Sequence, residues 1–351
     1  MVTETGLIKH QDLDPILHKS LDDPGIFVYT QEEVFDGPEA YIRFPTSDLD
    51  SILNLMASSK KRLVDVCNIN AGLVSGADRF SNSHSAKFPQ IKAEKGEGIF
   101  QVSLTEANLF PDENHLKPFF KNSDVSKWFV NEAPRSMVLY LQRDDAPTKY
   151  ELAHLKKYRP ILDIRRGVNA ETFPWWALYW PRKMEMFSGV KLVCPQRSSY
   201  NKFAYCDSEW FSSADVYYIT SKTDRTPLKA ILALLNSRLY FAWLYNRGKR
   251  KGEALELYQV PLSEIPIPEM TSLQIKAASE LVELTLKAAK AGNVSLQEKS
   301  EKDLDSLVYS IFSLSPEQIE SIEVFWIQKR SKFEPDVADD FDDDSLDFDE
   351  N

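Results

Sequence analysis

The chain has 351 residues, 43% of them hydrophobic, which suits two domains of ordinary size or one large domain with appendages. Its three cysteines are too few for a disulfide framework. No apolar run approaches the roughly 20 residues that cross a bilayer, and the N-terminus has no signal-peptide pattern. These features argue against a disulfide-rich secreted domain and a helical membrane protein, and we expect a cytoplasmic protein with no membrane partner.

The charge of the chain is unevenly distributed. The whole chain carries a formal net charge of −11, but the stretch from Lys149 to Lys251 has nineteen Lys or Arg and eight Asp or Glu, a balance of +11. Aromatic residues such as Trp175, Trp176 and Trp180 interleave with these cations. Base-stacking faces beside phosphate-binding charges are typical of nucleic-acid surfaces. The tryptophans also fit a packed core, whereas cations are rarely buried without a partner.

The first part of the chain shows strand and loop patterns. Residues 1–60 predict strands at 25–29 and 40–44 and a helix from 48 to 63, with no residues suited to chemistry. Residues 63–78 predict a strand that runs into a glycine turn, and residues 79–95 a long polar loop of the kind that is functional or disordered. A strand at 98–103, a turn at 116–124 and a strand at 136–141 complete this part. We interpret residues 1–60 as an extension or scaffold.

The second part combines helices with two strands. Residues 150–164 predict a helix whose basic face is equally consistent with a solvated surface. Strands are expected at 190–194 and 216–220, followed by one long, buried helix at 226–245 that ends beside the basic run 247–252. Prolines keep residues 261–268 extended, and three helices should follow from residue 272. The tail 335–351 has nine acids and no base, which predicts disorder. It could mimic phosphates, but a solubilising tail is the simpler interpretation.

Catalytic patterns are absent from the sequence. None of the five histidines pairs with another at ligand spacing, and the glycines at 96 and 98 precede a strand rather than join a strand to a helix. The chain has no G-x-S-x-G and no Walker-type motif, and Pro111-Asp112 lacks the downstream acid and lysine of a restriction-type nuclease. We therefore expect no catalytic residue, no metal site and no cofactor in this chain.

Seven segments in order resemble the C-terminal target-recognition, or specificity, domain of TaqI-like adenine DNA methyltransferases, including the fused enzymes of type II restriction–modification systems, and an eighth looks like the helical element that often follows that domain. The resemblance extends over about residues 61–325 and rests on residues 66–78, 116–124, 175–182, 197–205, 232–237, 247–252, 261–268 and 305–319. It implies an α+β fold: a mixed-sheet target-recognition domain at 61–268, a helical docking region at 269–330 and a disordered acidic tail at 331–351.

The resemblance also implies a partner and a cofactor. Members of the family normally carry a Gly-rich S-adenosylmethionine loop and an N-P-P-Y motif, and neither occurs in this sequence. We therefore expect a specificity part without its catalytic half, with S-adenosylmethionine on a partner or on a missing domain. The expected partners are double-stranded DNA and a methyltransferase or restriction subunit.

The resemblance implies two sets of DNA-binding residues. The candidates for reading bases are Arg197, Tyr200, Asn201 and Lys202, together with Arg79, Ser81 and Asn82 on a loop. The candidates for phosphate contacts are Lys121, Arg182, Lys183, Arg247, Lys249, Arg250 and Lys251. Arginine or lysine would read guanine and asparagine adenine, while phosphate contacts set the register. A cross-strand ion pair is the structural alternative for Arg197 and Lys202.

The expected function is sequence-specific recognition of duplex DNA by a chain that is non-catalytic by itself. One alternative is a fragment of a fused restriction enzyme and adenine methyltransferase. Another is an acidic interaction protein that masks its own DNA-binding face.

Overall fold

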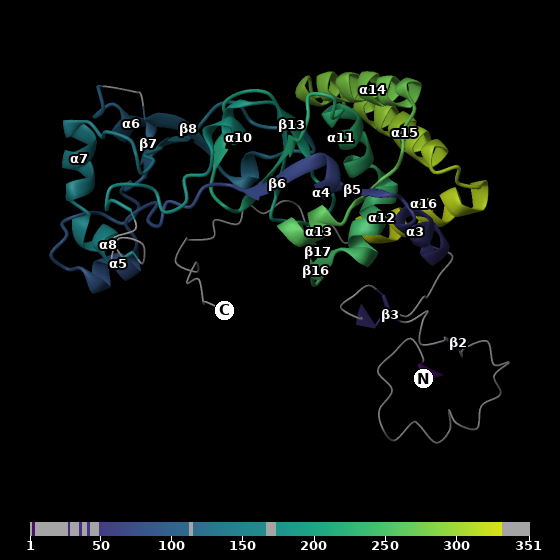
Figure 1. Ribbon diagram of the computed structural model, residues 1–351, viewed down its shortest axis with the longest axis horizontal. Helices are drawn as coiled ribbons and strands as arrows, with labels where there is room; N and C mark the ends of the chain where they lie inside the picture. The colour runs from purple at the N-terminus through teal and green to yellow at the C-terminus, as the bar shows by residue number, and fades with distance from the viewer. Residues whose placement is uncertain are drawn as a thin grey trace. The chain divides into compact units, whose positions relative to one another are not determined.

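The computed structural model describes residues 49–111, 115–165 and 173–331, and four short strands nearer the N-terminus (Figure 1). Two compact units make up the chain, Met1–Asn54 and Leu55–Asn351. In the first unit, β1 (Val2–Thr3) pairs with β2 (Phe27–Val28), and β3 (Phe35–Asp36) with β4 (Tyr41–Ile42). Helix α3 (Leu49–Ala57) crosses the boundary between the units. The expected disorder of the acidic tail from residue 332 onward lies outside the described residues.

Two mixed sheets organise the second unit. The five-stranded sheet has the order β6 (Cys67–Ala71), β15 (Val216–Ser221), β11 (Lys191–Pro195), β13 (Ala204–Cys206) and β9 (Trp128–Phe129). The four-stranded sheet has the order β14 (Phe211–Ser212), β8 (Leu116–Phe120), β10 (Ser136–Leu139) and β7 (Gln101–Ser103). Each sheet contains one parallel pair, β13 with β9 and β14 with β8, among antiparallel neighbours. The expected α+β class with mixed sheets is confirmed.

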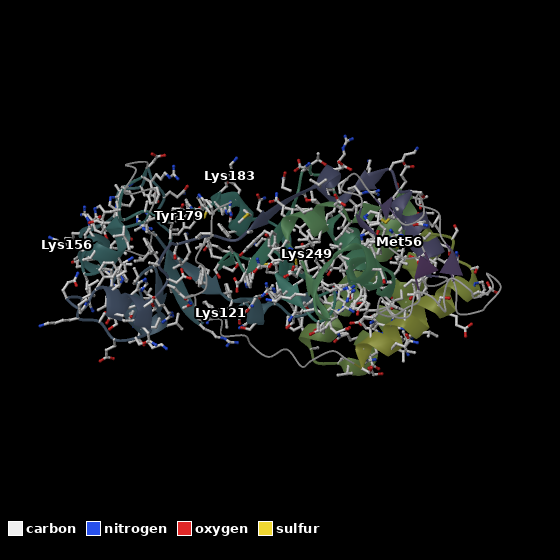
Figure 2. All side chains as sticks on the ribbon, turned by 90° about the horizontal axis from the view of Figure 1, so that it is seen from below. Met56, Lys121, Lys156, Tyr179, Lys183 and Lys249 are labelled. Carbon is white, nitrogen blue, oxygen red and sulfur yellow. The ribbon has the colours of Figure 1, made fainter. Side chains whose placement is uncertain are left out.

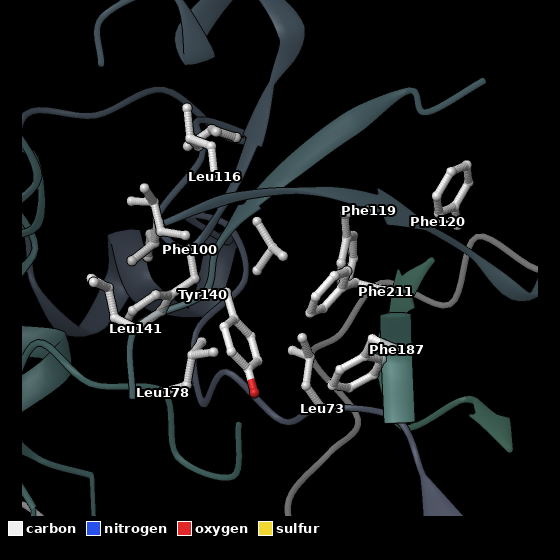
Figure 3. Packing of buried hydrophobic residues seen from close by; sticks show 14 of the residues in the cluster. Leu73, Phe100, Leu116, Phe119, Phe120, Tyr140, Leu141, Leu178, Phe187 and Phe211 are labelled. Atoms are coloured by element: carbon white, nitrogen blue, oxygen red, sulfur yellow. The ribbon is translucent and has the colours of Figure 1, made fainter. Parts of the chain in front are cut away.

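A large aromatic core supports these sheets (Figure 3). The ring of Phe187 stacks on that of Phe211 with centroids 4.4 Å apart, and Tyr140 meets Phe211 edge-on at 5.1 Å. Phe120 and Trp210 stack at 4.9 Å with an interplanar angle of 8°. Because buried aromatic pairs add to the free energy of burial, this region should be the most stable part of the unit.

All three cysteines are buried and free. Burial raises the pKa of the Cys67 thiol to about 12 and also raises the pKa of Cys194. Since the thiolate is the reactive form, the native protein should alkylate very slowly with iodoacetamide at pH 8, and fully only in denaturant. Mass spectrometry of both samples checks this. Rapid alkylation of Cys67 or Cys194 in the folded protein would contradict the described packing.

The prediction of one long helix at 226–245 is wrong, because the chain forms two helices there. These are α11 (Leu228–Asn236) and α12 (Arg238–Arg247), and Ser237 between them is extended, with a ψ of 159°. The Asn236 side chain accepts from the Phe203 amide at 3.0 Å and donates to the Phe203 carbonyl at 2.8 Å. The Ser237 hydroxyl then caps α12 by accepting from the Tyr240 amide at 3.3 Å. Both helices are largely buried, so the expected burial of this segment is confirmed.

Several other elements differ locally from the prediction. The helix expected at 150–164 is two helices, α7 (Lys149–Lys156) and α8 (Arg159–Asp163), because Tyr158 leaves the helical region and Pro160 lacks an amide donor. Residues 116–120 form β8 instead of a turn, and the loop 79–95 contains α5 (Asn82–Lys87). The extended segment 261–268 includes part of α13 (Gln259–Ser263) before β18 (Pro266–Ile267), which pairs with β5 (Lys61–Arg62). The remaining short elements are α4 (Leu63–Val66), α6 (Leu104–Ala107), η2 (Asn122–Asp124) and α10 (Met184–Ser188).

Three C-terminal helices pack against α11 and α12, as Figure 1 shows. They are α14 (Ser272–Lys290), α15 (Val294–Ile311) and α16 (Pro316–Arg330), and their presence confirms the three expected helices. The Asp305 carboxylate in α15 accepts from the Arg238 amide at 2.8 Å and so caps α12. Burial raises the pKa of Asp305 to about 6. Of the helices that the structure describes, none has the length and apolar character needed to cross a membrane.

Candidate nucleic-acid interface

A small three-stranded sheet gathers cations from two distant segments. Its strands are β12 (Arg197–Ser198), β17 (Ala254–Glu256) and β16 (Lys249–Lys251), with β17 in the middle. Glu256 lies opposite Arg197 on one side and opposite Lys249 on the other. We call these three strands the basic sheet. It brings together two of the sequence-predicted groups, Arg197 and the run from Lys249 to Lys251.

A buried carboxylate organises one face of the basic sheet. Glu256 is only 5% exposed, and its Oε1 lies 3.2 Å from a terminal nitrogen of Arg197 while its Oε2 lies 3.4 Å from Lys249 Nζ. Arg197 also donates to the Tyr258 hydroxyl at 3.2 Å. The cross-strand ion pair considered for Arg197 is thus confirmed, with Glu256 as its partner. The Arg197 side chain remains 39% exposed, so the ion pair orients the guanidinium without hiding it.

The other cations of the basic sheet are more open to solvent. Successive side chains of a strand point to opposite faces, so Arg250 faces away from Lys249 and Lys251. Arg250 lies over the ring of Tyr245 at 4.0 Å, and Tyr245 donates to Glu253 at 2.6 Å. Lys251 is exposed, and its side chain makes no ion pair within the described part of the chain. The basic sheet therefore presents positive charge on both faces.

Two predicted base-reading residues are buried, and their expected position facing a DNA groove is wrong. Asn201 is fully buried and donates through Nδ2 to the carbonyls of Leu235 at 2.7 Å and Ser237 at 2.8 Å. Its side chain thereby satisfies carbonyl groups at the break between α11 and α12, which explains why it points inward. Lys202 is 5% exposed, with its Nζ 6.0 Å from the ring centre of Tyr200. Tyr200 is itself partly buried.

The loop candidates have mainly structural contacts. Arg79 is partly buried and donates to the Gly96 carbonyl at 2.9 Å and to the Gln101 side chain at 3.3 Å, which fixes the loop 79–98. Ser81 caps α5 by accepting from the His84 amide at 3.2 Å. Asn82, by contrast, is exposed at the first position of α5. Of these three residues, Asn82 has the side chain most available to a ligand.

The remaining phosphate candidates come from separate elements. Figure 2 labels Lys121, Lys183 and Lys249, all three of them exposed. Arg182 has a positive φ of 65° and donates through Nε to the Gly72 carbonyl at 3.2 Å. Burial lowers the pKa of Arg182 and limits its exposed surface. Arg247 ends α12 and is also partly buried.

The aromatic block combines packed and exposed rings. Trp175 is partly buried and lies against the Arg159 guanidinium, with 4.2 Å from Cζ to the ring centre. Trp180 is 43% exposed, and its backbone pairs with Val74. The core interpretation therefore fits Trp175 better than Trp180.

Glu256 and Tyr258, which hold Arg197 in place, are not among the residues that the sequence predicted for the interface. A usable signal was Gly252, which has a positive φ of 62° in the tight turn that joins β16 to β17. Glycine at such a turn between alternating residues indicates a hairpin, and the hairpin register places Glu256 across from Lys249. Elsewhere in the described part of the chain, no group of three or more His, Cys, Asp or Glu is placed to hold a metal ion.

Comparison with known proteins finds similarity to two type II methyltransferases. It is 22% identical over 213 residues to type II methyltransferase M.HindII of Haemophilus influenzae, an alignment that covers 58% of this chain and 38% of that protein. It is 22% identical over 284 residues to M.HincII of Haemophilus influenzae, which covers 69% of this chain and 56% of that protein. This chain therefore spans about two fifths to just over half of the curated relatives it matches.

A family match covers a shorter stretch of the chain. Residues 148–267 match the TaqI-like C-terminal specificity domain. The match is shorter than the resemblance seen in the sequence at 61–325, but it includes all three strands of the basic sheet. The fold is similar to that of the type IIL restriction–modification enzyme MmeI, solved in complex with DNA, with a TM-score of 0.51 and 17% identity. That similarity covers 78% of this chain and 36% of MmeI.

Proposed function

We propose that the chain recognises a specific sequence in duplex DNA as the specificity part of an adenine-specific restriction–modification system. The observation that carries this proposal is the basic sheet, which lies inside the TaqI-like specificity domain and presents Arg197 beside Lys249, Arg250 and Lys251. Duplex DNA is the polyanion that such a domain would meet, and exposed cations on a sheet fit its phosphates and groove edges.

The residues of the basic sheet divide into two roles in this proposal. Arg197 has a planar guanidinium held by Glu256 and Tyr258, and it is the candidate for reading guanine in the major groove. Lys249 and Lys251 are flexible point charges on the exposed strand β16 and suit phosphate oxygens. Sequence recognition would then depend on Arg197, and the strength of binding would depend on Lys249 and Lys251.

Chemistry is assigned in this proposal to a separate catalytic domain or subunit. A methyltransferase that acts on adenine must extrude the base, so the duplex has to be held from a second side during the reaction. Methyl transfer requires S-adenosylmethionine, which we place on that catalytic partner. The helices α14, α15 and α16 are our candidate for the surface that contacts the partner.

Binding of the purified chain to a random duplex library tests the proposal. Selection at two salt concentrations, followed by sequencing of the retained DNA, should return an enriched motif that survives the higher salt. Phosphate contacts weaken steeply with salt, whereas base contacts set the sequence preference. Retention without any enriched motif would contradict sequence recognition by this chain alone.

A second candidate is that the chain corresponds to the specificity portion of a longer fused enzyme. The observation that favours it is that this chain spans only 38% and 56% of the two related methyltransferases. In that case an open reading frame would continue upstream of the present first codon. Sequencing the transcript around that codon distinguishes a separate subunit from a fused enzyme.

A further inference from the structure

A second basic surface lies outside the basic sheet. An open pocket of about 740 Å³ forms between the segment around Lys92 and the junction of α7 with α8. Four cations line it, Lys92, Lys156, Lys157 and Arg159, together with a single lining carboxylate, Asp163. Figure 2 shows Lys156 well apart from Lys249, so this pocket is separate from the basic sheet.

Contacts within the protein fix one edge and one face of the Arg159 guanidinium and leave its terminal amino groups available to an external acceptor. Its Nε donates to both carboxylate oxygens of Asp163, at 2.7 and 2.9 Å, and its guanidinium lies 4.2 Å from the ring centre of Trp175. Its two terminal amino groups make no hydrogen bond within the described residues. A guanidinium fixed on one edge and one face presents its remaining N–H groups to a pair of oxygens, which is the geometry that phosphate provides.

The lysines of the pocket differ in how far they are neutralised. Lys157 forms an ion pair with Glu97. Lys92 and Lys156 are exposed, and neither has an ion-pair partner in the part of the chain that the structure describes. Uncompensated cations grouped around one pocket raise the local positive potential and attract an anion.

We infer that this pocket binds the phosphodiester backbone of duplex DNA at a second place, away from the bases read at the basic sheet. The inference rests on the proposed function and adds a second contact to it. Lys156, Lys157 and Arg159 lie within the stretch 148–267 that matches the specificity domain, as the basic sheet does, whereas Lys92 comes from an earlier segment. Gln90 also lines the pocket, but the four cations are its main charged groups, and Lys or Arg contacts to phosphates carry no sequence information directly.

The test compares two charge-matched variants of the full chain. Lys92→Gln with Lys156→Gln removes two pocket cations, and Lys276→Gln with Lys299→Gln removes two exposed cations from α14 and α15. The dissociation constants for the selected duplex and for a scrambled duplex are measured over a range of salt concentrations. For the pocket variant, the slope of log K against log salt should become shallower by about 2, near 0.9 per lost phosphate contact. Affinity for both duplexes should fall by the same several-fold factor, and the control variant should keep the slope of the unaltered chain.

The outcomes separate this inference from the proposed function. If the unaltered chain selects a motif but the pocket variant keeps the original slope, the pocket does not bind DNA and only this inference is overturned. If the pocket variant weakens binding to the selected duplex alone, the pocket reads bases and the phosphate assignment is wrong. If the unaltered chain binds no duplex, the proposed function fails and the inference fails with it. Arg159→Gln provides an independent variant, and it should make the slope shallower by about 1.

Discussion

Replacement of Arg197 by alanine should weaken binding of the full chain to its cognate duplex by about tenfold or more, which corresponds to about 1–3 kcal/mol for one good base contact. The expected cause is the loss of the guanidinium that Glu256 and Tyr258 hold at the edge of the basic sheet. Equilibrium titration of cognate and scrambled duplexes by fluorescence anisotropy measures the effect. The loss of affinity should be larger for the cognate duplex than for the scrambled duplex. The dissociation constant for the scrambled duplex divided by that for the cognate duplex should therefore fall.

Two further variants separate base reading from charge and from folding. Arg197→Lys keeps the positive charge near Glu256 but loses the planar fork, so binding to the scrambled duplex should persist while preference for the cognate duplex is lost. Arg225→Ala is the matched control, because Arg225 is exposed and follows Ser221, at the opposite end of the β11–β15 pair from Arg197. Unchanged cognate affinity of Arg197→Ala, with a thermal midpoint like that of the unaltered chain, would refute the assignment of Arg197 to base reading.

The burial of Lys202 limits which substitutions can test the interface. Lys202 was grouped with Arg197 as a residue of the same exposed surface, but it is 5% exposed and its neighbour Asn201 is fully buried. A double substitution of Arg197 and Lys202 would therefore combine loss of a surface contact with damage to the interior. Substitution of Arg197 by itself gives a result that can be assigned to the interface.

Local patterns in the sequence were sufficient to predict those strands and helices that depend only on residues close together in the chain. The apolar runs of β11 and β15 and the helical periodicity of α14 and α15 depend on residues within a few positions of one another, and these elements lie where the sequence predicted them. The α+β class and the specificity domain were expected for another reason, the resemblance of ordered segments of the chain to a known family. The break at Ser237 was not, because it depends on hydrogen bonds from Asn236 to Phe203, a residue in a distant segment.

The candidate site was predictable in composition but not in geometry. The excess of Lys and Arg indicated a basic surface, and Arg197 and Lys249 do meet on one sheet. Their meeting depends on β17, whose Glu256 pairs with both of them. The Gly252 hairpin indicates the register with Lys249, but no short-range pattern specifies the pairing with Arg197 in the distant strand β12. The burial of Asn201 has the same origin, since its amide group bonds to carbonyls of a helix much later in the chain. The polar type of Asn201 suggested a contact with DNA, whereas its side chain is used for hydrogen bonds inside the protein.

Replacement of Trp210 by alanine should lower the free energy of unfolding by about 3–5 kcal/mol, the range for removing a large buried aromatic side chain. Trp210 is fully buried and stacks on Phe120, and its Nε1 donates to the Asn131 carbonyl at 3.0 Å. The substitution would leave a cavity beside the four-stranded sheet and an unpaired carbonyl at Asn131. Urea unfolding followed by circular dichroism measures the change, since removal of a tryptophan alters the fluorescence signal itself.

Two control variants, Trp180→Ala and Trp210→Phe, complete this experiment. Trp180 is 43% exposed, and its backbone bonds with Val74 do not need the side chain, so Trp180→Ala should cost less than about 1 kcal/mol. Trp210→Phe keeps a ring against Phe120 but removes the donor to Asn131, and its cost should lie between the other two. Equal losses for Trp210→Ala and Trp180→Ala would show that Trp210 does not lie in the core described here. The expected order, by contrast, would establish that the region around the four-stranded sheet depends on this stacked pair for its stability.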